Sequence, residues 1–132
     1  MKKIISIFAF IISLNVSSQD FNESLKKLET ENQKCLDKGK FMYECSLSFY
    51  KKSDSLLNVV YKQVRKKMNS AEKDKLKNEQ LKWLKIRNQK FENINNSDTR
   101  LGNGLDNLMI KEQEKAVIVN ERTKYLILKF KP

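Results

Sequence analysis

Residues 105–130, LDNLMIKEQEKAVIVNERTKYLILKF, carry the most regular apolar pattern in the chain. Positions on one face recur at alternating steps of four and three, which is the spacing of one side of an α-helix. Because most of these positions are apolar, we predict a long helix with one face in a core. The positions are Leu105, Met109, Glu112, Ala116, Val119, Thr123, Leu126 and Phe130.

Three further helices are predicted upstream, at about 21–36, at about 40–68 and from Ser70 to about Ile94, from the same three- and four-residue spacing. Gly39 separates the first two, and Ser70 is expected to cap the third. The 132 residues include only 3 Gly and 1 Pro, so the turn chemistry that short strands need is scarce. We therefore predict an all-α fold, a small bundle of three to four antiparallel helices.

The N-terminus has the order of a signal peptide. A basic start, Met1–Lys3, precedes an apolar run from Ile4 to Leu14 and then small residues up to Ser18. The run is too short for a bilayer span, which takes roughly 20 residues. We predict that residues 1–18 are removed and that 19–132 form a single helical domain; the alternative is an N-terminal anchor that is never cut.

The chain is strongly basic. It has 27 basic and 16 acidic residues, and removal of Lys2 and Lys3 leaves 25 − 16 = +9 for the expected mature chain. Such a charge favours anionic partners, but export and the lack of a nucleic-acid-binding motif argue against nucleic acid. Anionic cell-wall polymers or lipid headgroups fit better, and the alternative is that the charge serves only solubility.

The composition argues against catalysis. The chain has no His, which excludes His-based acid–base chemistry and His metal ligation. The acidic residues are scattered among lysines, without the spacing of a metal site or of a glycosidase pair. We expect a non-enzymatic binding protein without metal or cofactor.

Cys35 and Cys45 are the only cysteines. In an oxidising compartment an even count indicates a disulfide, here one that ties the first helix to the second across Gly39. The closed loop of about 11 residues corresponds to about 3 kcal/mol in the chain-entropy description. A redox role would need a tighter and more reactive pair.

Polar residues follow helical spacing on the second and third predicted helices. If the turn at Ser70 folds these helices into an antiparallel hairpin, residues that face each other have position numbers with a constant sum. Three pairs share the sum of 141. They are Asp54 with Arg87, Asn58 with Trp83, and Tyr61 with Gln80.

We interpret these pairs as a polar seam beside Trp83 that fixes the register of the two helices. It predicts an ion pair between Asp54 and Arg87 and a hydrogen bond between Tyr61 and Gln80. The alternative is that Trp83 and Arg87 form an exposed hot spot for a partner.

The same residues resemble the bacterial LprI-like lysozyme-inhibitor domain family of exported helical proteins. The resemblance rests on Cys45, Asp54-x-x-Leu57-Asn58-x-x-Tyr61, Gln80-x-x-Trp83-x-x-x-Arg87 and Arg122-x-x-x-Leu126, and covers nearly all of the expected mature chain. Members commonly have a second cysteine pair, which this chain lacks. Phe91 stands at the first of those positions, and an apolar contact from it to the final helix is a hypothesis for the replacement.

The resemblance implies a secreted or periplasmic protein that inhibits lysozyme by direct binding. Two alternatives remain open at this point. One is a basic envelope protein that binds anionic cell-wall or lipid components. The other is an assembly component whose last helix packs on another protein; the oligomeric state is not indicated.

Overall fold

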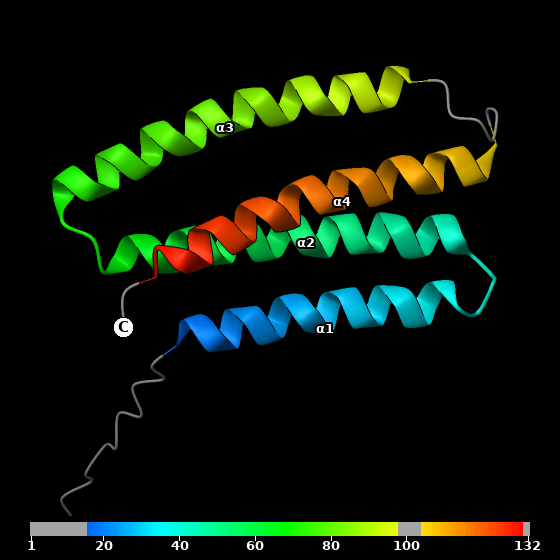
Figure 1. Ribbon diagram of the computed structural model, residues 1–132, viewed down its shortest axis with the longest axis horizontal. Helices are drawn as coiled ribbons and strands as arrows, with labels where there is room; N and C mark the ends of the chain where they lie inside the picture. The colour runs from blue at the N-terminus through cyan, green and yellow to red at the C-terminus, as the bar shows by residue number, and fades with distance from the viewer. Residues whose placement is uncertain (1–15, 98–103, 131–132) are drawn as a thin grey trace, which may run out of the picture.

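The computed structural model describes residues 16–97 and 104–130, and all four of its regular elements are α-helices. They are α1 (Ser18–Leu36), α2 (Met42–Lys66), α3 (Ser70–Asn96) and α4 (Leu105–Leu128). Successive helices run in opposite directions, and α1, α2 and α4 lie side by side while α3 stands farther out (Figure 1). The predicted all-α bundle is confirmed.

The core lies mainly between α2 and α4, which share the most extensive contact among the described helices. Val60 of α2 and Val119 and Leu126 of α4 have no exposed surface. Full burial of such a side chain contributes about 1.5–3 kcal/mol relative to exposure. The centre of the predicted stripe on the last helix is therefore buried, whereas Leu105 at its start is 64% exposed.

Helix α3 is attached differently. Of its 27 residues only Leu76 and Gln80 are buried. Because one apolar side chain gives little hydrophobic stabilisation, the position of α3 depends on further contacts of half-buried aromatic and charged residues.

Side-chain caps define where two of the helices begin. Ser17 and Asp20 form a reciprocal capping box at the start of α1. Asn69 and Glu72 form another at the start of α3, with Asn69 Oδ1 accepting from the Glu72 amide at 2.9 Å. The expectation that Ser70 caps this helix was therefore wrong by one residue, because the Asn69 side chain already satisfies the free amide.

The predicted disulfide is confirmed. Cys35 in the last turn of α1 is bonded to Cys45 in the first turn of α2, with the two Cα atoms 5.8 Å apart. The bond therefore clamps the connection 37–41 at its base.

The first 15 residues of the predicted signal peptide lie outside the described residues, as do residues 98–103 between α3 and α4. No helix among residues 16–97 and 104–130 is long and apolar enough to cross a membrane. A cut after Ser18 remains a prediction, and it would remove the capping residue Ser17.

We predict that replacing both cysteines with serine lowers the free energy of unfolding by about 3 kcal/mol, because the unfolded chain regains the entropy of the closed loop. Denaturant titration of the double variant measures the loss, and reduction of the wild-type protein should reproduce it. A loss below about 1 kcal/mol would show that the bond does not constrain the unfolded chain as proposed.

Candidate functional site

The polar residues singled out from the sequence gather where α2, α3 and α4 come together. Five of them line a groove of about 320 Å³ between α2 and α3, which is bordered on its apolar side by Leu57, Leu81 and Leu84. Trp83 and Arg122 lie beside this groove and not in its lining. The five are Asp54, Asn58, Tyr61, Gln80 and Arg87.

Trp83 is the centre of the arrangement. The guanidinium carbons of Arg87 and of Arg122 each lie 5.6 Å from the centre of its ring. This is within the range in which a cation is attracted to an aromatic face, an interaction of about 0.5–2 kcal/mol. Since Arg122 belongs to α4 and Trp83 to α3, the contact holds these two helices together.

Arg122 also reaches the buried amide of α3. Its Nε donates a hydrogen bond of 2.9 Å to Gln80 Oε1, and its guanidinium lies 4.6 Å from the ring centre of Tyr125. Burial lowers the pKa of Arg122 from its ordinary value, and the negative charge of Glu79 acts in the opposite direction. The group stays protonated at neutral pH because guanidinium loses its proton only far above that range.

The structure contains the predicted ion pair of Asp54 and Arg87. Arg87 Nη1 lies 3.8 Å from Asp54 Oδ1, and the side chains are 21% and 35% exposed. Arg87 also donates from Nε and Nη2 to Asn88 Oδ1. At this distance and exposure the ion pair contributes no more than roughly 1 kcal/mol. It therefore shows the register of α2 and α3 but adds little to its stability.

The predicted hydrogen bond between Tyr61 and Gln80 is wrong. Gln80 turns to α4 and accepts from Arg122, while Tyr61 stays on the α2 wall of the groove with Arg65 at 5.5 Å from its ring centre. Asn58 likewise bonds within α2, donating to the Asp54 carbonyl at 3.1 Å. The reason is competition from α4, because Arg122 takes the Gln80 side-chain oxygen, whereas the facing pair of Asp54 and Arg87 is in contact.

Phe91 of α3 contacts an aromatic residue of α2. Its ring meets Tyr50 edge to face at a centroid distance of 5.7 Å. On the α4 side, Lys115 Nζ lies 5.9 Å from the ring centre, and Phe91 packs against the apolar core; an apolar contact with the last helix stays a prediction. Phe91 thus links α3 to both neighbouring helices.

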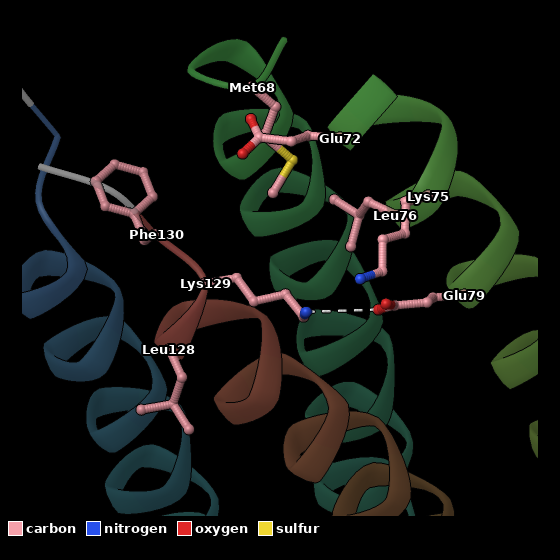
Figure 2. Close-up of a pocket in the computed structure, with 8 residues that line it drawn as sticks. All are labelled: Met68, Glu72, Lys75, Leu76, Glu79, Leu128, Lys129 and Phe130. Carbon is pink, nitrogen blue, oxygen red and sulfur yellow. Dashed lines mark ion pairs between the residues drawn. The ribbon is translucent and has the colours of Figure 1, made fainter. Parts of the chain in front are cut away.

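A second hollow, of about 380 Å³, lies where α2 ends and α3 begins. In Figure 2, Lys129 reaches from the end of α4 towards Glu79 of α3, and their ion pair measures 3.6 Å. The remaining walls mix apolar and charged side chains, with Met68 and Leu76 among the former. No cluster of three potential metal ligands occurs among the described residues.

The family model described as Lysozyme inhibitor LprI matches residues 31–126, which is most of the chain. The chain belongs to this family. The LprI match spans the disulfide, the groove and the contacts of Trp83. No curated protein and no solved structure matches the chain significantly.

One polar contact of the chain could not be predicted from the sequence. Gln113 of α4 exchanges amide hydrogen bonds of 3.0 Å with Asn32 of α1 and donates to Ser46 Oγ of α2 at 2.8 Å. The contact joins three helices beside the disulfide. Its partners are up to 81 residues apart, and no local spacing in the sequence reveals such a pairing.

We predict that Gln80 and Arg122 are energetically coupled. In a double-mutant cycle with Gln80→Ala and Arg122→Ala, the coupling should be about 1–2 kcal/mol, because the bond has a charged donor in a half-buried place. Thermal or denaturant unfolding measures each corner of the cycle. The matched cycle with Tyr61→Phe and Gln80→Ala should give a coupling near zero, and the reverse ranking of the two cycles would refute this geometry.

Proposed function

We propose that this protein is an exported, non-catalytic inhibitor that acts by binding lysozyme directly. Membership of the LprI lysozyme-inhibitor family over residues 31–126 is the observation that carries the proposal. The N-terminal signal-like sequence and a disulfide suited to an oxidising compartment support export.

The chemistry of the chain supports binding over catalysis. It has no His, and the groups around Trp83 are engaged with one another: Arg122 with Gln80, and Arg87 with Asp54. Groups that hold helices together in this way form a scaffold, and inhibition then requires only that a surface of the scaffold block the enzyme.

Charge sets a condition on the interaction. The basic excess lies on α2 and α3, whereas acidic and basic residues nearly balance on α1 and α4. A basic lysozyme would be repelled at long range by α3, so productive approach should use another side of the inhibitor. At 0.1 M salt this repulsion is largely screened at distances greater than about 10 Å.

We predict that the chain starting at Gln19, with its disulfide formed, inhibits lysozyme on a soluble oligosaccharide substrate. A soluble substrate is essential, because a basic protein that merely coated cell walls would also slow their lysis. As inhibitor is added, the turnover rate should fall and then level off at a fixed molar ratio of inhibitor to enzyme. An unrelated basic protein of equal charge is the control, and an unchanged rate at large excess of this protein would reject the proposal.

Binding to anionic envelope components is the second candidate. It is favoured by the exposed lysines of α3, among them Lys75, Lys82 and Lys85. This function would weaken steeply with salt, because exposed charges separated by more than a Debye length are screened. Lysozyme inhibition should persist at salt concentrations that release the protein from anionic vesicles, which separates the two functions.

A further inference from the structure

The connection between α1 and α2 projects an aromatic side chain into solvent. All residues from Asp37 to Phe41 are exposed, and Phe41 is 76% exposed. Phe41 also has φ 53° and ψ 38°, and it is the only non-glycine residue with positive φ in the described part of the chain. A bulky residue rarely adopts this left-handed conformation, which is costly without surrounding constraints.

Neighbouring backbone contacts hold Phe41 in place while its ring stays free. Its carbonyl accepts from the Cys45 amide at 3.0 Å, and the Gly39 amide donates to the Leu36 carbonyl at 2.9 Å. Gly39 adopts φ 64°, which costs glycine little. The backbone strain at Phe41 is therefore imposed by the connection, and packing of the ring does not offset it.

The base of the connection is rigid. The disulfide joins Cys35 to Cys45, which is only 5% exposed. Beside it, the amide pair of Asn32 and Gln113 and the bond to Ser46 fasten α1, α2 and α4 together. A loop fixed in this way loses little conformational entropy when it binds a partner.

Two lysines precede Phe41 in the connection. Lys38 and Lys40 are exposed and have no ion-pair partner among the described residues. The one acidic residue of the connection, Asp37, accepts a hydrogen bond from the Gln33 amide at 2.7 Å. The tip therefore presents an exposed apolar ring together with two ammonium groups that form no ion pair with the described residues.

We propose that this tip, residues 37–41, is the part of the protein that enters the substrate cleft of lysozyme. The inference rests on the proposed function. A glycosidase cleft holds a pair of carboxyl groups at the scissile bond, and ligand sites are largely apolar around such polar groups. Phe41 then fills a sugar position, and Lys38 and Lys40 face the carboxyl groups. This local complementarity operates even when both proteins are basic overall.

Substitution of Phe41 separates binding from stability. Phe41→Gly removes the ring and accommodates the left-handed backbone, so its unfolding midpoint should equal or exceed that of the wild type. Its inhibition constant should nevertheless rise roughly tenfold or more, as expected for loss of an interface anchor. Leu128→Ala is the matched control, because Leu128 is 85% exposed and ends α4 at the other end of the bundle (Figure 1).

Charge reversal tests the second part of the tip. Lys40→Glu should weaken inhibition, while Lys82→Glu, at a lysine that is also exposed but lies on α3, should leave it near the wild-type value. Inhibition by the wild-type protein should also be competitive with a soluble N-acetylglucosamine oligomer, because both would occupy the cleft.

The outcomes distinguish the two proposals. If the wild-type protein inhibits and Phe41→Gly and Lys40→Glu inhibit equally well, the tip is not the contact. The same follows if inhibition by the wild type is non-competitive. In both cases the inhibitor function remains supported. No inhibition by the wild-type protein overturns both. The proposed contact is supported if the two tip variants fold but lose inhibition, while the two control variants inhibit like the wild type.

Discussion

The hydrogen bond from Arg122 to Gln80, made beside the ring of Trp83, is the constraint on which the position of α3 depends. Helix α3 is 27 residues long but buries only Leu76 and Gln80. A helix with so little apolar contact is not fixed by the hydrophobic effect alone. The buried amide must find a partner, and Arg122 supplies it across the gap to α4.

The rest of the molecule is organised around a body of three helices. In that body α2 and α4 share the apolar core, and α1 covers it with Phe21 and Leu25. One end is fastened by the disulfide and by the amide contacts of Gln113. The proposed contact tip lies at this rigid end, whereas the polar groove lies along the looser side between α2 and α3.

Helix positions could be read from the sequence because apolar spacing and burial obey the same period, as Val119, Thr123 and Leu126 illustrate. The disulfide followed from cysteine count and compartment. The constant-sum alignment placed Asp54 opposite Arg87, which is correct. It failed for Tyr61 and Gln80, because it treated α2 and α3 as an isolated pair in contact and left out α4, whose Arg122 takes the amide.

Other features need the three-dimensional arrangement. The bond between Asn32 and Gln113 joins residues 81 positions apart, and no spacing rule links them. The exposure and left-handed backbone of Phe41 also escape sequence reasoning, since an aromatic residue near a helix start is ordinarily read as part of the core.

Amide hydrogen exchange in the wild type and in Arg122→Met tests the central claim most directly. Met keeps much of the apolar length of the side chain but removes the donor to Gln80. If Arg122 holds α3, exchange should accelerate selectively in α3 while amides in the centres of α2 and α4 keep their protection. Unchanged protection in α3, or an equal loss in all helices, would contradict the account.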